Sequence, residues 1–270
     1  SETGDRTYCA SALRVLEPNV RKILMGAGDA KPKEIAKIKT SKGLLGKTSS
    51  QKEAAAKDVV VKEVRTEDLI SQVSDYSRID ASLASILALY GGLVNWSQIA
   101  NLKARSGAVA TGIWKLLERR FEMSAGSSVN RARCICKLGE AMVSSGKDAE
   151  DASMVDDGGA QYRRALGMIN NRVHAPLYAI TAYGLAESIV ASAIINDILV
   201  PDSQVVPVFE AALKVCARRD HPYIWGRTMF ALATVHMTNG TVNKDMELLE
   251  RARRGFSQAY EAFVDAGAKG

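Results

Sequence analysis

Residues 207–264 read PVFEAALKVCARRDHPYIWGRTMFALATVHMTNGTVNKDMELLERARRGFSQAYEAFV, and their apolar residues follow the spacing of amphipathic helices. A first helix precedes a turn at Gly240 and carries Trp225, Leu232 and Ala233. A second helix carries an aromatic residue and small residues on one face: Ala252, Phe256 and Ala259. Because small residues let a neighbouring helix approach closely, the stretch predicts a tightly packed helical hairpin.

The same pattern recurs along the chain. One series lies in the middle of apolar segments at intervals of 48, 47 and 47 residues: Tyr90-Gly91, Leu138-Gly139, Leu185-Ala186 and Leu232-Ala233. A second series has the same intervals: Trp114, Tyr162, Phe209 and Phe256. Three residues after each aromatic stand Leu117, Ala165, Ala212 and Ala259. This self-similarity predicts an all-α fold, a right-handed stack of antiparallel helix pairs with a period of about 47 residues.

Turn and capping residues predict the helix ends. Turns between the helices of a pair are expected at Ser144-Ser145-Gly146, Asn196-Asp197 and Asn239-Gly240. Second helices are expected to begin at Asp156-Asp157 and Pro201-Asp202-Ser203. First helices are expected to begin at Pro176 and Pro222, just after His174 and His221. Near the N-terminus, a helix over residues 6–26 is expected to break at Pro18.

The hairpin pattern resembles tetratricopeptide-like repeats of a long-period type over roughly residues 131–266. The residues named above in 207–264 fit the two helices of such a repeat, and residues 131–168 match more weakly. The period differs from the family's usual value of about 34 residues, and the family's closing proline is missing. The resemblance implies a solenoid-like stack that binds proteins on its concave face.

The composition favours helices in a soluble protein. Hydrophobic residues make up 47% of the 270 residues, and only six residues are Pro. No apolar run is expected to reach the roughly 18 residues that cross a bilayer, and the polar start SETGDRTY is not expected to be a signal peptide. The cysteines form no CxxC pair, which predicts free thiols in the cytoplasm: Cys9, Cys134, Cys136 and Cys216.

The sequence carries no recognisable catalytic motif. It contains neither HExxH nor GxSxG, and its three histidines are far apart. Residues 43–48 (GLLGKT) match the end of a phosphate-binding loop, but Ser41 stands at the first glycine position and no strand is expected before it. We therefore expect a non-enzymatic protein without a cofactor or a bound metal ion.

Positive charge is concentrated near the N-terminus. Residues 1–65 hold 14 Lys and Arg against 8 Asp and Glu, a net charge of +6, whereas residues 66–270 hold 22 of each. We therefore divide the chain into a basic N-terminal arm with short helices (1–65) and an α-helical repeat body (66–270). The arm is either a solvated linker or a contact for nucleic-acid phosphates. In the second case the expected contacts are Lys33, Lys37, Lys39, Lys42 and Lys47.

Arginine pairs recur in the predicted body. Arginine side chains suit phosphates, so a second set of candidate nucleic-acid contacts comprises Arg119, Arg120, Arg163, Arg164, Arg218 and Arg219. Their offsets from the repeated aromatic residues differ, so they need not share one face. The alternative is ion pairing with acids of the same body, such as Glu118, Glu122, Glu210 and Glu250.

Two functions fit these features. The first is a structural protein, similar to a viral coat protein or nucleoprotein, that self-associates into an oligomer or filament. It would bind the backbone of single-stranded nucleic acid without sequence specificity, in the cytoplasm or in a virion. The second is a tetratricopeptide-like adaptor or scaffold that binds a protein segment on its concave face. Affinity for nucleic acid should fall steeply with salt in the first case, whereas an adaptor should be indifferent to polyanions.

Overall fold

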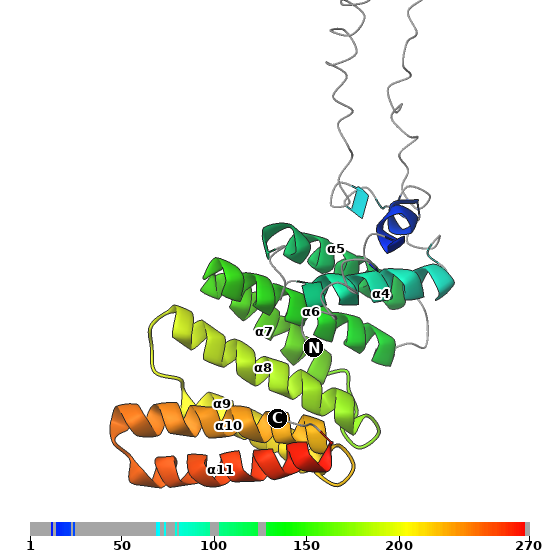
Figure 1. The fold of residues 1–270 in the computed structure, drawn as a ribbon. Helices are drawn as coiled ribbons and strands as arrows, with labels where there is room; N and C mark the ends of the chain where they lie inside the picture. The colour runs from blue at the N-terminus through cyan, green and yellow to red at the C-terminus, as the bar shows by residue number, and fades with distance from the viewer. Residues whose placement is uncertain are drawn as a thin grey trace, which may run out of the picture.

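The computed structural model describes residues 81–97, 103–123 and 128–267, together with residues 12, 15–22, 24, 69–70, 73 and 79. Its long helices are α4 (Ala81–Ser97), α5 (Lys103–Glu122), α6 (Ser128–Ala149), α7 (Ala152–Leu166), α8 (Ala175–Ile195), α9 (Asp202–Val215), α10 (Pro222–Asn243) and α11 (Met246–Asp265). Each of these helices packs against the next one along the chain (Figure 1). The fold is all-α, as the sequence predicts.

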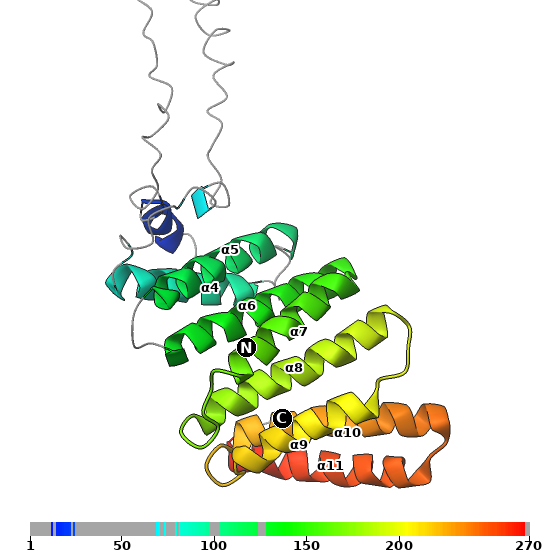
Figure 2. The ribbon, with the colours of Figure 1, turned by 180° about the vertical axis from the view of Figure 1, so that it is seen from behind.

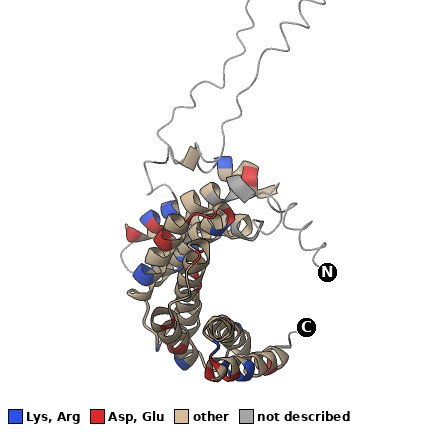
Figure 3. Ribbon diagram, turned by 90° about the vertical axis from the view of Figure 1, so that its left-hand side faces the viewer, with Lys and Arg blue, Asp and Glu red and all other residues tan. Residues whose placement is uncertain are grey.

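Alternate helices from α6 onward form one layer, called the inner layer below. In addition to their neighbours in sequence, α6 contacts α8 and α8 contacts α10, so these three helices lie side by side. α9 lies behind α10 in the front view and in front of it in the back view, whereas α11 runs along the lower edge of the body in both (Figures 1 and 2). The body curves like the letter C, with α8 and α10 toward its open side (Figure 3). The 47-residue period of the sequence stays a prediction.

The two series of recurring residues fall on different helices. Tyr90, Leu138, Leu185 and Leu232 lie in the even-numbered helices, whereas Trp114, Tyr162, Phe209 and Phe256 lie in the odd-numbered ones. The first three aromatic residues are buried, and Phe256 is half-buried. The residue three positions after each aromatic is also buried. The recurring positions are therefore the ones where neighbouring helices meet.

α6, α7 and α8 pack closely around the ring of Tyr162, which is 5% exposed. A Cβ atom at Gly139 of α6 would lie 3.0 Å from the backbone oxygen of Gly158 and 3.3 Å from Cδ1 of Tyr162. A Cβ atom at Gly184 of α8 would overlap the Tyr162 ring. The two glycines therefore leave the space between α6 and α8 that the aromatic ring of α7 fills.

Three expected helix ends are wrong. Ser144-Ser145-Gly146 lies inside α6, and Asn239-Gly240 lies inside α10. Asp156-Asp157 lies inside α7, because the N-cap of that helix is Asp151, whose carboxylate accepts a hydrogen bond from the Met154 N–H at 3.1 Å. Tertiary contacts explain why α10 does not end at its Asn-Gly pair: the Asn239 side chain donates to the Val200 carbonyl at 2.9 Å.

Other expected helix ends are confirmed. α8 ends just before Asn196, and α9 begins at Asp202. His174 and His221 are the N-cap residues of α8 and α10, and a proline follows each one within the first two helical positions. Proline suits these positions because the first helical N–H groups have no partner within the helix.

Part of the predicted N-terminal arm belongs to the core of the body. Residues 15–22 are helical, and Val20 and Leu24 are buried in one apolar cluster with Leu87 and Ile113. The expected break at Pro18 is wrong, because the helix continues through it. The side-chain amide of Asn19 donates to the Val15 carbonyl at 3.4 Å, in the turn around the proline.

The expectation that no segment crosses a membrane stays a prediction, and one described helix bears on it. α8 is long and apolar enough to cross a membrane by length and composition, and half of its most apolar stretch is buried in the protein. α8 packs between α7 and α9, and helices buried inside a helical body have the same composition.

We expect Gly184→Ala to lower the free energy of unfolding by about 1–3 kcal/mol, because the added methyl group overlaps the packed Tyr162 ring. Gly92→Ala in α4 is the matched control. A Cβ atom at Gly92 meets nothing within 4 Å, so this substitution should stabilise the helix by about 0.5–1 kcal/mol. Urea unfolding followed by circular dichroism measures both values. Equal stability of Gly184→Ala and the wild type would contradict the close packing.

Candidate functional site

The inner layer carries a groove of about 460 Å³, walled by α6, α8 and α10. Tyr162 of α7 also reaches the groove, through the space between Gly139 and Gly184. The apolar and aromatic part of the lining comprises Val143, Ile180, Ile224, Tyr162, Tyr183 and Tyr223. Concave surfaces that combine such side chains with a few charged groups are typical of binding sites.

The charges that line the groove balance. Its cations are Lys137, Lys147 and Arg227, and its carboxylates are Glu140, Asp148 and Glu187. The Lys137 ammonium lies 2.5 Å from the Glu140 carboxylate, within α6. Because the two signs are equal in number, the groove has no net attraction for a polyanion.

One cluster of polar side chains joins two walls of the groove. The guanidinium of Arg227 on α10 lies 4.3 Å from the centre of the Tyr183 ring on α8. Burial raises the pKa of the Tyr183 hydroxyl well above its usual range, and the Glu187 carboxylate raises it further. Burial disfavours the charged form of Arg227, but attraction to Tyr183 and Glu187 outweighs this effect and raises its pKa. Arg227 therefore stays charged and Tyr183 stays neutral at physiological pH.

The thiols in and near the groove are poor nucleophiles. Burial raises the pKa of Cys136, which lines the groove and accepts a hydrogen bond from the Thr181 hydroxyl at 3.5 Å. Burial also raises the pKa of Cys134 to about 12, and the negative charge of Glu118 contributes. Because the thiolate is the reactive form of cysteine, neither side chain is prepared for covalent chemistry.

None of the predicted nucleic-acid contacts that the structure describes lines the groove. Lys33, Lys37, Lys39, Lys42 and Lys47 fall outside the residues that the structure describes. Arg119, Arg163 and Arg219 are exposed. None of the six predicted arginines lines the groove: Arg119 and Arg120 belong to α5, Arg163 and Arg164 to α7, and Arg218 and Arg219 to the turn before α10.

Three of the predicted arginines bind groups of the same chain. Arg120 donates to the Ile79 carbonyl, and Arg164 donates to Glu118 and to Gln161. Arg218 lies 2.6 Å from the Asp265 carboxylate and 3.0 Å from that of Glu261. The guanidinium of Arg218 also lies 5.9 Å from the centre of the Trp225 ring. These contacts compete with any phosphate for the same donors.

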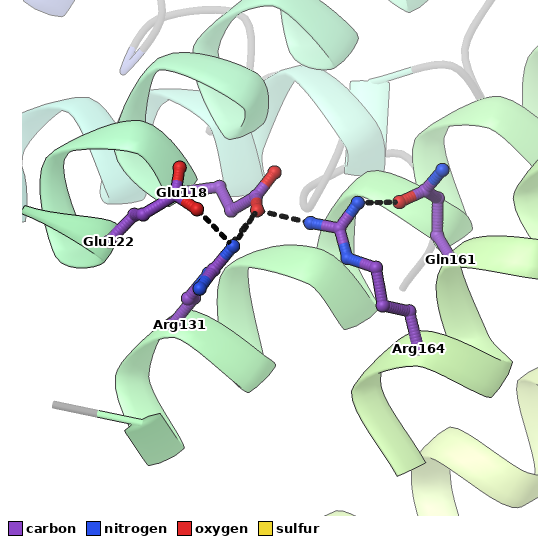
Figure 4. A network of polar contacts seen from close by, with 5 residues as sticks. All are labelled: Glu118, Glu122, Arg131, Gln161 and Arg164. Carbon is purple, nitrogen blue, oxygen red and sulfur yellow. Dashed lines mark hydrogen bonds and ion pairs between the residues drawn. The ribbon is translucent and has the colours of Figure 1, made fainter. Parts of the chain in front are cut away.

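A largely buried carboxylate organises the ion pairs among α5, α6 and α7 (Figure 4). Glu118 of α5 accepts from Arg131 of α6 and from Arg164 of α7, and Arg131 also reaches Glu122 at 2.7 Å. The Glu118 side chain is only 12% exposed. The ion-pairing interpretation of the sequence is therefore confirmed for these arginines. It is also confirmed for Arg253 and Arg254, which pair with Glu250.

Sequence reasoning identified neither the groove nor its polar cluster. Tyr183 and Glu187 are four residues apart, which places them on one face of a helix, but nothing nearby in sequence points to Arg227. The expected ion pair of Glu210 is absent, because this carboxylate pairs with none of the arginines that the structure describes. Only the stacking of α8 against α10 brings the groove residues together.

Comparison of the chain with known protein families, with curated proteins and with solved structures finds no match. Within the described residues, no group of three or more His, Cys, Asp and Glu side chains is placed to hold a metal ion. The class of protein defined here is an all-α stack of helix pairs with a groove on its inner layer.

We expect Glu118→Gln to lower the free energy of unfolding by about 1–2 kcal/mol, because two arginines lose their shared, largely buried anion. Arg253→Gln is the matched control, since Arg253 and Glu250 form a solvent-exposed pair, and it should leave the stability unchanged. Urea unfolding compares the two variants. The network does not hold the three helices together if both variants are as stable as the wild type.

Proposed function

We propose that this protein is a non-enzymatic scaffold that binds a polypeptide segment in the groove formed by α6, α8 and α10. The observation that carries the proposal is the lining, where apolar and aromatic side chains stand beside three cations and three carboxylates. A polypeptide segment can match this lining because it supplies apolar side chains, backbone donors and acceptors, and charges of both signs. A nucleic-acid backbone, by contrast, brings only negative charge toward the three carboxylates.

The cluster around Tyr183 supports the proposal. Its ring packs against Phe209, with 6.0 Å between the ring centres, and against the Arg227 guanidinium. Tyrosine and arginine are frequent energetic anchors of protein interfaces. A side chain that is already held in place loses little conformational entropy when a partner binds, so more of the contact energy contributes to affinity.

Two isoleucines of α8 give a matched test. Ile180 lines the groove and is 44% exposed, whereas Ile194 is 68% exposed and lies outside it. Peptides selected from a random displayed library on the full chain should bind Ile180→Glu at least about tenfold more weakly than the wild type, because an unpaired carboxylate enters the apolar part of the site. Ile194→Glu should bind them normally. Fluorescence anisotropy with the synthetic peptides measures the affinities.

Either of two results would contradict the proposal. A selection that yields no binding peptide, or peptides that bind Ile180→Glu and the wild type equally well, rules out the groove as a polypeptide site. Circular dichroism of both variants excludes unfolding as the cause of any loss.

A second candidate function is sequence-blind binding of single-stranded nucleic acid, with self-association as in a coat protein or nucleoprotein. The observation that favours it is the net charge of +6 in residues 1–65. The balanced charge of the groove and the internal ion pairs of the body arginines give it no support. In this case the contacts would come from the lysines of the N-terminal segment.

Replacing Lys33, Lys37, Lys39, Lys42 and Lys47 by Gln in the full chain tests this second function. Affinity for a labelled single-stranded RNA should fall at least about tenfold, and the wild-type affinity should fall steeply between about 50 and 200 mM salt. The control replaces five other lysines by Gln, which changes the net charge equally: Lys115, Lys137, Lys147, Lys214 and Lys244. Absence of binding at low salt, or equal loss in both variants, would contradict a specific role of the N-terminal lysines.

A further inference from the structure

Arg227 of α10 differs from the arginines that hold the body together. Arg164 and Arg218 lie in direct contact with carboxylates of the chain itself. Arg227 forms no ion pair with a carboxylate in the part of the chain that the structure describes. Its side chain is exposed and lines the groove. A charged guanidinium is therefore accessible to a molecule that enters the groove.

The guanidinium of Arg227 is held in place by its contact with Tyr183. It lies 4.3 Å from the centre of the Tyr183 ring, and this ring packs in turn against Phe209, which is 1% exposed. The Glu187 carboxylate, on the same helix as Tyr183, attracts the guanidinium from a longer distance. An arginine that is stacked on a ring loses less conformational entropy on binding than a free one, and the N–H groups at the edge of its plane can still donate to an acceptor.

The other charged residues of α6 in the groove are compensated by immediate neighbours. The Glu140 carboxylate lies 2.5 Å from the Lys137 ammonium, and Lys147 and Asp148 are adjacent in the sequence and carry opposite charges. Within the described groove lining, Arg227 has no carboxylate so close. The group best able to bind a new ion is therefore a guanidinium, which donates two parallel hydrogen bonds to a carboxylate.

Apolar surface lies one helical turn away from this cation. Ile224 stands three residues before Arg227 on α10, and Ile180 stands three residues before Tyr183 on α8, so each isoleucine shares a helix face with its polar neighbour. Both isoleucines line the groove, and Ile180 is 44% exposed. One helical turn is about 5.4 Å long, and an extended chain advances about 3.3 Å per residue. One or two residues of an extended segment therefore span the distance between the charged and the apolar contact.

We infer that the segment bound in the groove carries an Asp or Glu side chain whose carboxylate binds Arg227. This acidic residue stands one or two positions from a large apolar residue, whose side chain packs on Ile180 and Ile224. A carboxylate fits this place better than a phosphate, because the second negative charge of a phosphate would be repelled by Glu187. The inference rests on the proposed function, since it names the chemistry of the segment that the groove binds.

Peptides selected on the full chain test the inference. They are synthesised with amidated C-termini, so that only side chains supply carboxylates. The peptides that require Ile180 should share an acidic residue, and replacing this residue by Asn or Gln should weaken binding to the wild type at least about tenfold. On Arg227→Gln the same replacement should change the affinity less than about twofold, because the carboxylate has already lost its partner. Fluorescence anisotropy measures the four affinities.

Arg253→Gln is the matched control, because Arg253 is an exposed arginine of α11 outside the groove. This variant should discriminate between the acidic and the amide peptide as strongly as the wild type. Because each comparison places two peptides on one protein, a loss of stability in Arg227→Gln does not imitate the expected result. Circular dichroism verifies that both variants are folded.

The possible outcomes separate this inference from the groove proposal. Peptides that require Ile180 but no acidic residue, or equal discrimination by the wild type and Arg227→Gln, overturn the inference and leave the groove proposal intact. Tighter binding of peptides that carry phosphoserine at the acidic position overturns the choice of a carboxylate. A selection that yields no peptide rules out the groove as a polypeptide site, and with it the role of Arg227.

Discussion

The close approach of α6, α7 and α8 around the ring of Tyr162 sets the geometry of the central body. A side chain at Gly139 would crowd this ring, and one at Gly184 would overlap it. Because both residues are glycine, Tyr162 of α7 can reach between α6 and α8. Burial of the ring gives apolar stabilisation, but its position also fixes the spacing of α6 and α8. The groove lies over this contact, and Tyr162 itself forms part of its lining.

Electrostatics in this protein act mainly within the chain. Glu118 joins three successive helices through Arg131 and Arg164, and Arg218 joins the start of α10 to the end of α11 through Asp265. In the groove, Arg227 of α10 lies over the ring of Tyr183 on α8, and the charge of Glu187 acts on both side chains. Arginine recurs in the body because helices that contact through small residues leave polar side chains at their margins, where a long guanidinium can reach the next helix. The excess positive charge of the chain therefore belongs to the N-terminal segment, whereas the charges of the body balance.

The packing of one helix pair against the next also distinguishes the pair α10 and α11 from the pair α8 and α9. In the pair α8 and α9, the contact between Tyr183 and Phe209 is covered because α10 lies against it. The pair α10 and α11 repeats the contact with Phe230 and Phe256, and within the described residues no further helix covers it, so Phe230 is 51% exposed.

The sequence by itself determined the helical fold and the main buried positions. The spacing of apolar residues reports a helix and its buried face locally, and Tyr162, Phe209 and the small residues near them were placed correctly for that reason. Only the tertiary structure decided that α6 and α10 continue through Gly146 and Gly240. It also decided the pairing of Arg164 with Glu118 across 46 residues and the contact of Tyr183 with Arg227. Turn residues such as Asn239 were misread because their contact, the Val200 carbonyl, lies 39 residues away. The local spacing of residues contains no information about contacts between residues so far apart in sequence. These contacts depend on how whole helices pack against each other.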